Sequence, residues 1–236
     1  MELVKTFLYY FRPSRLFKDF KRGYFFGFNN QISFIRYVWF ARLLKRLSID
    51  PNLEGVGGFE YSRDTFSKFT PLDRIYFPIF ALSSIPELSK DDLLIIGPRY
   101  ENEIYVCAAL GFEVKKISLI DSITYSPKIS AGNMHAMPFK SEKFSSVICS
   151  WTLSYSTNPK NAAEEIQRVS RTGGFIVISV DKVDFKNQKP AVEGLLAGSA
   201  RIQTVNQIQA LFTSCKVVMS FEPKTEGMLV CVLQKV

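Results

Sequence analysis

Short apolar runs alternate with amphipathic stretches through the middle of the chain. Residues 93–96 read Leu-Leu-Ile-Ile and end at Gly97, the pattern of a strand buried on both faces. Residues 117–120, 145–150 and 175–180 give three further strands, and apolar residues recur at helical spacing within 101–110 and 161–171. We expect Gly111 to end the first of these helices and Gly173-Gly174 the second. Strands that alternate with helices predict a parallel sheet.

Two β-rich segments close the chain. Residues 216–221 and 228–233 are separated by the turn formers Pro223 and Gly227, which favours an antiparallel hairpin added to the sheet. The predicted fold is therefore α/β: a Rossmann-like, doubly wound, mostly parallel sheet with a C-terminal antiparallel hairpin and a helical N-terminal extension. With 236 residues and 47% hydrophobic content, one such domain with an extension is the expected organisation.

Asp121 stands at the tip of the second predicted strand. Ligands of open α/β sheets bind just beyond the carboxyl ends of the strands, where a carboxylate can accept hydrogen bonds from two ribose hydroxyls. The alternative is an aspartate that only caps a turn. Asp121 follows Gly97 in the sequence by about one βαβ half-unit, and this spacing favours the ligand-binding interpretation.

The stretch Gly-Asn-Met-His-Ala-Met-Pro-Phe at residues 132–139 is followed by Phe-Ser-Ser-Val-Ile at 144–148. Further on come Glu-Ile-Gln-Arg-Val at 165–169 and Gly-Gly at 173–174. In these segments the chain resembles class I S-adenosylmethionine-dependent methyltransferases of the methyltransferase type 11 family. The resemblance covers about residues 93–180 together with the terminal hairpin, and it implies S-adenosylmethionine as cofactor.

The first loop departs from that family. Where the family has Gly-x-Gly-x-Gly, residues 97–103 read Gly-Pro-Arg-Tyr-Glu-Asn-Glu, with a single glycine. One interpretation is a domain that no longer binds cofactor; the other is a substituted site in which charged side chains replace backbone contacts. On the second interpretation, we expect these cofactor-binding residues: Gly97, Arg99, Glu101 (or Glu103), Asp121, Asn133, Met134, Ser150 and Trp151.

His135 is the only histidine of the chain. Its place in the methyltransferase-like motif suggests that it shapes the adenine pocket, and catalysis as a general base is the alternative. We expect no metal site and no Ser-His-Asp triad. The four cysteines lack metal-ligand spacing, which favours reduced core thiols in a cytoplasmic protein.

Charge is concentrated at the N-terminus. Residues 1–50 hold ten Lys and Arg against three acidic residues, a net charge of +7 out of +8, and 14 of the 33 aromatic residues. Such a segment suits an anionic membrane surface or nucleic acid, and clumping of the aromatics favours the membrane. Arg36 and Arg42 interrupt the best candidate for a membrane span, residues 32–47. A helical lid over the cofactor site explains the composition equally well.

These observations predict a basic, aromatic-rich extension or lid over residues 1–58, a hinge near Gly57-Gly58, and a methyltransferase-like domain over residues 59–236. Sequences with this Gly-Pro-Arg loop resemble methyltransferase-like proteins associated with cell-surface polysaccharide assembly, which implies a small-molecule, sugar or lipid-linked acceptor. The competing classes are a non-catalytic scaffold or partner subunit and a nucleic-acid methyltransferase. The expected location is cytoplasmic, with peripheral attachment to the inner face of the membrane.

Overall fold

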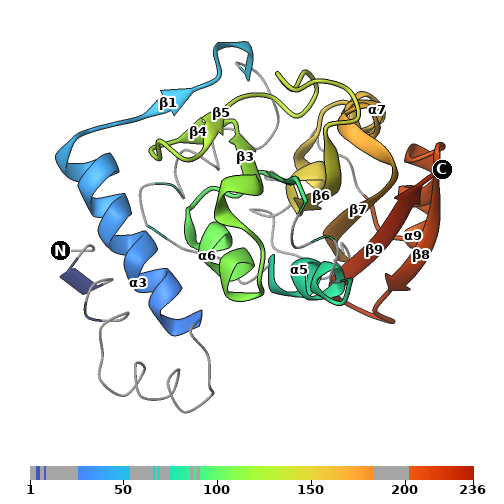
Figure 1. The fold of residues 1–236 in the computed structure, drawn as a ribbon, viewed down its shortest axis with the longest axis horizontal. Helices are drawn as coiled ribbons and strands as arrows, with labels where there is room; N and C mark the ends of the chain where they lie inside the picture. The colour runs from blue at the N-terminus through green and yellow to red at the C-terminus, as the bar shows by residue number, and fades with distance from the viewer. Residues whose placement is uncertain are drawn as a thin grey trace.

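The computed structural model describes residues 26–53, 75–85, 91–182 and 202–236, together with six single residues: Val4, Lys5, Leu8, Phe66, Phe69 and Leu88 (Figure 1). A large mixed sheet crosses the centre of this part of the chain. Helices cover both faces of the sheet, and helix α3 lies outside it at the end far from the C-terminus.

The main sheet of the described residues has seven strands in the order β5-β3-β2-β6-β7-β9-β8. The first five are parallel, and β9 lies antiparallel between β7 and β8. The predicted fold class and its C-terminal hairpin are therefore confirmed. The strands are β2 (Leu93–Ile96), β3 (Ile117–Asp121), β5 (Ser130–Ala131), β6 (Phe144–Ser150), β7 (Ser170–Lys182), β8 (Cys215–Phe221) and β9 (Gly227–Lys235).

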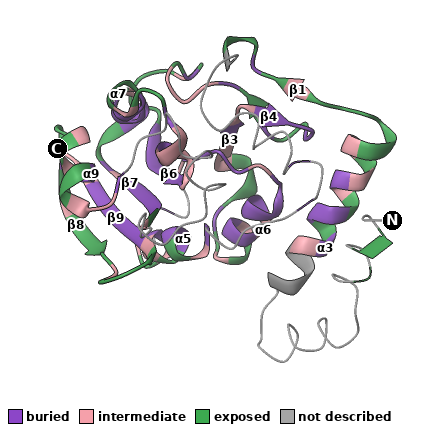
Figure 2. Cartoon of the chain, turned by 180° about the vertical axis from the view of Figure 1, so that it is seen from behind, coloured by how far each residue is buried: buried purple, intermediate pink, exposed green. Residues whose placement is uncertain are grey.

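Strand β2 shows why its sequence is apolar throughout. Leu93 and Ile95 pack with helices α5 (Tyr76–Ser83) and α6 (Asn102–Ala109) on one face of the sheet. The alternate residues, Leu94 and Ile96, pack with helix α7 (Pro159–Val169) and helix α9 (Val205–Leu211) on the other. All four side chains are buried, because a strand between two helical layers has no polar face. Figure 2 shows the same burial along much of β7 and β9.

Helix α7 ends earlier than its sequence suggests. Its N-terminus is capped by Asn158, whose side chain accepts a hydrogen bond from the backbone of Asn161. The helix stops at Val169, and Ser170 already pairs with Phe144 of β6, so the prediction of a helix to residue 171 ended by glycines was wrong. Gly174 instead lies within β7, where an added Cβ would come within 2.9 Å of a carbonyl oxygen of β6. Strand pairing therefore overrides the glycine stop signal.

Residues 26–53 are mostly helical and include one short strand. Helix α3 (Phe26–Tyr37) continues into a π-helical turn, η1 (Val38–Leu43), and then into β1 (Ser48–Ile49), which pairs antiparallel with β4 (Ile123–Thr124). The remaining short helices are η2 (Pro51–Leu53), η5 (Val114–Lys116) and η6 (Thr152–Tyr155). No helix among the described residues is long and apolar enough to cross a membrane. The predicted hinge at Gly57-Gly58 and most of residues 1–25 lie outside the described residues.

An aromatic cluster joins α3 to the main domain. Its buried residues are Phe34, Tyr37, Phe66, Phe69, Tyr100, Ile123 and Tyr125. Tyr37 is central: its ring contacts those of Phe69, Tyr100 and Tyr125 at centroid distances of 5.1, 6.0 and 5.4 Å. Since Tyr100 and Tyr125 follow β2 and β3, the inner side of α3 packs close to the carboxyl ends of these strands.

Candidate functional site

The order of the strands creates a switch point between β2 and β6. From β2 the chain runs outward through β3 to β5, and it then returns to place β6 on the other side of β2. The segments that leave β2 and β6 therefore diverge, and ligands of open α/β sheets bind at such a point. Gly97, Asp121 and Trp151, each at or just after the end of its strand, lie at this carboxyl edge.

Asp121 holds the loop that follows β2. One carboxylate oxygen accepts a hydrogen bond of 2.7 Å from the backbone N–H of Arg99. The other accepts hydrogen bonds from the Ser122 hydroxyl at 3.2 Å and the Ile123 backbone at 3.3 Å. A carboxylate offers about four acceptor positions, so these three donors leave capacity for a ligand hydroxyl. Asp121 thus caps a turn and keeps acceptor capacity at the carboxyl edge of the sheet.

Two residues at this edge have strained backbones. Arg99 and Trp151 have φ angles of +56° and +62°, in the left-handed region that bulky residues rarely adopt. The Trp151 backbone is held there by a hydrogen bond of 2.6 Å to the carbonyl oxygen of Ser179. Its indole Nε1 is buried and makes no hydrogen bond to the protein. Strain and an unsatisfied buried donor are both typical of functional sites.

Thr152 packs directly on Gly97. An added Cβ on Gly97 would lie 2.0 Å from Thr152 Oγ1, and the φ angle of this glycine is +74°. The Thr152 hydroxyl donates to the carbonyl oxygen of Ile96 at 3.3 Å or that of Ser150 at 3.2 Å. The glycine is therefore required by close packing between the two strand ends, and the space above it is filled by this threonine.

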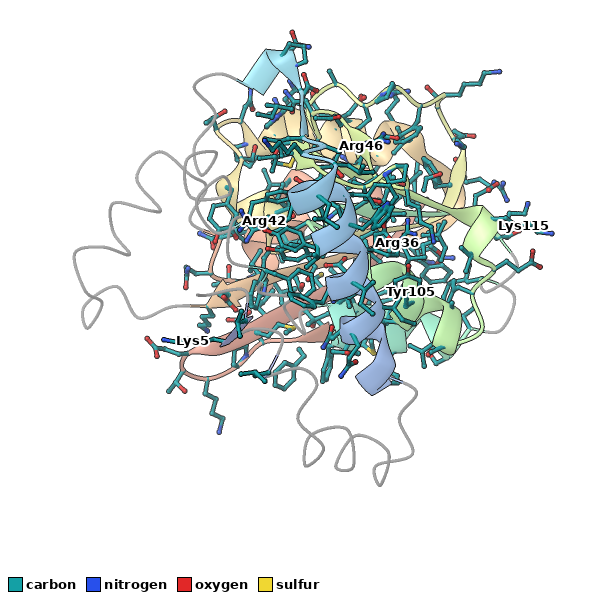
Figure 3. The ribbon with its side chains drawn as sticks, turned by 90° about the vertical axis from the view of Figure 1, so that its left-hand side faces the viewer. Lys5, Arg36, Arg42, Arg46, Tyr105 and Lys115 are labelled. Carbon is teal, nitrogen blue, oxygen red and sulfur yellow. The ribbon has the colours of Figure 1, made fainter. Side chains whose placement is uncertain are left out.

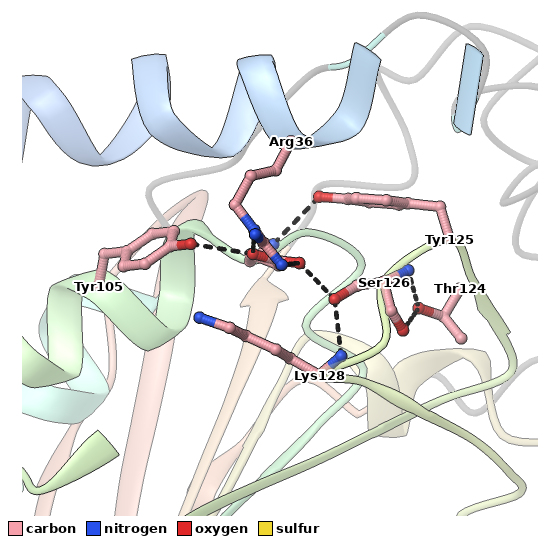
Figure 4. Close-up of polar contacts among 7 residues, drawn as sticks. Arg36, Tyr105, Thr124, Tyr125, Ser126 and Lys128 are labelled. Atoms are coloured by element: carbon pink, nitrogen blue, oxygen red, sulfur yellow. Dashed lines mark hydrogen bonds and ion pairs between the residues drawn. The ribbon is translucent and has the colours of Figure 1, made fainter. Parts of the chain in front are cut away.

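Glu101 does not face the same space. Its side chain is completely buried and lies against α3, where it forms an ion pair with Arg36 (Figure 4). The hydroxyls of Ser126 and Tyr105 also donate to the Glu101 carboxylate. Burial alone would raise the pKa of Glu101, but the hydrogen bonds from Arg36, Ser126 and Tyr105 outweigh it and hold that pKa below its ordinary value. Glu101 thus fastens α3 to the start of α6 rather than presenting a charge to a ligand.

The loop at residues 132–139 is held by side chains from α7. Glu165 accepts a hydrogen bond of 2.7 Å from the backbone of Met137. Arg168 donates to the carbonyl oxygens of Phe139 at 2.9 Å and Met137 at 3.2 Å, and pairs with Glu165. Met134 packs against the core beside this loop. The two motif segments are therefore one structural unit, in which the Glu-Arg pair fixes the loop.

His135 lies in a hydrogen-bonded row between Asn133 and Ser156. Its Nδ1 is 2.6 Å from Asn133 Oδ1, and its Nε2 is 2.6 Å from Ser156 Oγ. The amide oxygen can only accept, so Nδ1 donates and Nε2 accepts from the serine hydroxyl. Burial lowers the pKa of His135, which favours this neutral form. The imidazole therefore ties the loop to the segment before α7.

The row formed by Asn133, His135 and Ser156 has the order of a nucleophilic triad, but an asparagine amide stands where a Ser-His-Asp triad has a carboxylate. Ser156 is completely buried, however, and also accepts a hydrogen bond from the backbone of Asn158 at 3.1 Å. Its hydroxyl is therefore not accessible to a substrate. Over the described ranges, no group of three His, Cys, Asp or Glu side chains is arranged to hold a metal ion.

The remaining predicted residue, Ser150, is buried, and its hydroxyl shares a hydrogen bond of 2.6 Å with that of Ser179 in the neighbouring strand. Sequence reasoning missed Thr152 and Arg36. Thr152 follows Trp151 directly, so its position after a strand end was a usable signal. Arg36 gave no signal, because 65 residues separate it from Glu101.

Residues 107–178 match the methyltransferase domain family. An S-adenosylmethionine-dependent methyltransferase from Mesorhizobium loti has a TM-score of 0.50 and 10% identity, over 67% of this chain and 96% of its own. A Thermotoga maritima S-adenosylmethionine-dependent methyltransferase has a TM-score of 0.45 and 17% identity, and the match covers 75% of this chain and 95% of that one. A Haloferax volcanii methyltransferase in complex with the Trm112 activator has a TM-score of 0.49 and 12% identity, and the match covers 80% of this chain and 99% of that one. Comparison of the sequence with curated proteins found no match.

The residues at the carboxyl edge fit S-adenosylmethionine at its nucleoside end. Asp121 has capacity for a ribose hydroxyl, and the loop with Asn133 and Met134 follows the next strand outward. Beside Gly97, the Thr152 side chain occupies the position that a Cβ on this glycine would take. Residues 107–178 thus match the methyltransferase domain family, and the chain has the fold of an S-adenosylmethionine-dependent methyltransferase of known structure.

Proposed function

We propose that the chain is an S-adenosylmethionine-dependent methyltransferase that acts on a small-molecule, sugar or lipid-linked acceptor. The observation that supports it best is the combination at the switch point of strained Arg99 and Trp151, the unsatisfied indole N–H of Trp151 and the carboxylate of Asp121. A domain kept only as a scaffold has no need of strain and an unpaired donor at this position.

Each residue has a proposed role in binding. Asp121 accepts a ribose hydroxyl, and Asn133 lies on the adenine side with Met134. The Arg99 guanidinium pairs with the carboxylate of the methionine part. Bound S-adenosylmethionine supplies a methyl group on a sulfonium. Trp151 covers the space between β2 and β6, excludes water and orients the acceptor, since much of the acceleration of methyl transfer comes from holding the two reactants in line.

His135 is proposed to shape the adenine side of the site. Both of its ring nitrogens are hydrogen bonded, so general-base catalysis would require Nε2 to release the Ser156 hydroxyl. The neutral imidazole is more useful as a rigid spacer that keeps Asn133 in place.

A non-catalytic partner subunit is the second candidate. Two contacts favour it: Thr152 packs on Gly97, and Arg36 pairs with Glu101. In both, a residue that was predicted to bind cofactor packs within the protein instead. A nucleic-acid methyltransferase is the less favoured enzyme class, and its substrate binding would weaken steeply with salt. A reducing, cytoplasmic setting is supported by the four free, buried cysteines.

Transfer of a labelled methyl group tests this proposal. Purified protein is incubated with methyl-labelled S-adenosylmethionine and with one of three extracts. The first contains small molecules, the second contains lipids and lipid-linked glycans, and the third contains nucleic acid. The proposal predicts label in one of the first two extracts, and loss of that label with Asp121→Ala. Label in nucleic acid alone would support the less favoured enzyme class. Saturable cofactor binding without methyl transfer to any extract would support the second candidate, a non-catalytic partner subunit.

A further inference from the structure

Helix α3 and turn η1 carry a second row of apolar side chains that faces away from the protein. Phe34 and Tyr37 point inward to the aromatic cluster. On the outer side, at helical spacing, stand Ile32, Ile35, Trp39 and Leu43, with exposures of 43%, 55%, 55% and 64%. Leu44 and Leu47 extend this row and are also more than a third exposed. A helix at a protein surface ordinarily has apolar residues only on the side that packs against the core.

Exposed cations lie beside this outer row. Arg42, Lys45 and Arg46 are all exposed, and Figure 3 shows the arginines distributed along the segment. Residues 26–49 contain no aspartate or glutamate, and Asp50, the first acidic residue after them, is buried. The exposed side of the segment is therefore apolar and purely cationic.

We propose that the outer face of α3 and η1, formed by Ile32, Ile35, Trp39, Leu43, Leu44 and Leu47, docks on an anionic lipid surface without crossing it. Aliphatic side chains enter the boundary of headgroups and acyl chains, and tryptophan prefers this depth. The long side chains of Lys45 and Arg46 reach the lipid phosphates. This proposal is independent of the methyltransferase reaction.

Charge complementarity favours lipid over a second copy of the chain. A dimer through this face would bring the same three cations of each copy together, with no carboxylate from residues 26–49 to neutralise them. An anionic membrane supplies the missing negative charge at uniform density. No helix among the described residues is a candidate span, which agrees with attachment at the surface.

Docking would be transmitted to the main domain through Arg36. This residue belongs to α3, and its partner Glu101 stands immediately before α6. Tyr37 adds buried ring contacts to Tyr100 and Tyr125. A membrane that holds the outer face of α3 therefore also positions the loop after β2.

Vesicle flotation of the full chain tests the proposal, with phosphatidylcholine vesicles and with vesicles that also contain phosphatidylserine. We expect flotation only with the acidic vesicles, decreasing as salt is added. Lys45→Gln with Arg46→Gln should weaken binding about 5-fold for each cation removed. The matched control is Lys216→Gln with Lys224→Gln, which removes the same charge from exposed positions on β8 and the turn after it and should leave flotation unchanged.

Trp39→Ala with Leu43→Ala tests the apolar row and should also abolish most flotation, while thermal unfolding confirms that the exposed substitutions leave the fold intact. In the unaltered chain, Trp39 should show a blue shift of fluorescence on adding acidic vesicles, which Trp39→Ala removes. The proposal is overturned if the control pair weakens flotation as much as the test pair. It is also overturned if the unaltered chain does not float, or if Trp39→Ala changes only the oligomeric state seen by sedimentation.

Discussion

Replacing Arg36 by methionine should destabilise the protein strongly at neutral pH. The substitution leaves the carboxylate of Glu101 completely buried, with only the hydroxyls of Ser126 and Tyr105 as donors. Loss of one partner of a buried ion pair costs about 3–5 kcal/mol. Because the Arg36 side chain is 29% exposed, we expect the lower end of that range, about 3 kcal/mol. For a chain of this length this corresponds to a fall in Tm of about 6–12 °C.

The pH dependence of this stability loss gives a sharper test than its size at neutral pH. In the unaltered protein the pKa of Glu101 is lowered, so its contribution to stability is present above the unfolded value, about 4.3, and is lost as pH falls through the folded pKa. In Arg36→Met, burial dominates and raises that pKa. The free-energy cost of burying the unpaired Glu101 carboxylate is then present at neutral pH and disappears as this carboxyl becomes protonated. The stability difference between the two proteins should therefore shrink as pH falls.

Urea unfolding between pH 4 and pH 8 measures both quantities, with Arg46→Met as a control that removes an exposed arginine from the same segment. The control should change the free energy of unfolding by less than about 0.5 kcal/mol. Adding Glu101→Gln to Arg36→Met should restore part of the lost stability, since the buried charge is removed. A loss below about 1 kcal/mol that does not vary with pH would refute the reasoning, because exposed ion pairs behave in that way.

Three further predictions concern the carboxyl edge of the sheet. Asp121→Ala should weaken binding of S-adenosylmethionine in calorimetry by about 10- to 150-fold, whereas Asp91→Ala, at the amino end of β2, should leave it unchanged; equal losses would contradict a ribose contact. Gly97→Ala should lower the free energy of unfolding by about 1–3 kcal/mol, and less when Thr152→Ala is also present; an equal cost in both backgrounds would contradict the packing contact. Trp151→Phe removes an unsatisfied buried donor, so it should leave the unbound protein at least as stable but weaken ligand binding; unchanged binding would exclude a role for Nε1.

The architecture was predictable because local patterns determine it. The apolar run of β2 requires two covering layers, and the turn formers after β8 favour the observed hairpin. The early end of α7 was not predictable, because it depends on pairing of Ser170 with Phe144. Local signals such as glycines cannot report a partner strand that is distant in sequence.

The candidate site was predictable in position but not in its contacts. The strand-tip location of Asp121 follows from the pattern, whereas its hydrogen bond to the backbone of Arg99 depends on a left-handed residue that no pattern indicates. Charge alone suggested that Glu101 serves a ligand. Its partner Arg36 comes from helix α3, 65 residues earlier in the chain, and only the fold brings the two together.

Calorimetric titration of the unaltered protein with S-adenosylmethionine and S-adenosylhomocysteine decides whether the chain binds this cofactor. We expect saturable binding of both ligands at one site per chain, and substantial loss of both in Asp121→Ala. The absence of heat and of any thermal shift at millimolar ligand would contradict it, and would mean that Thr152 and Gly97 close the site permanently.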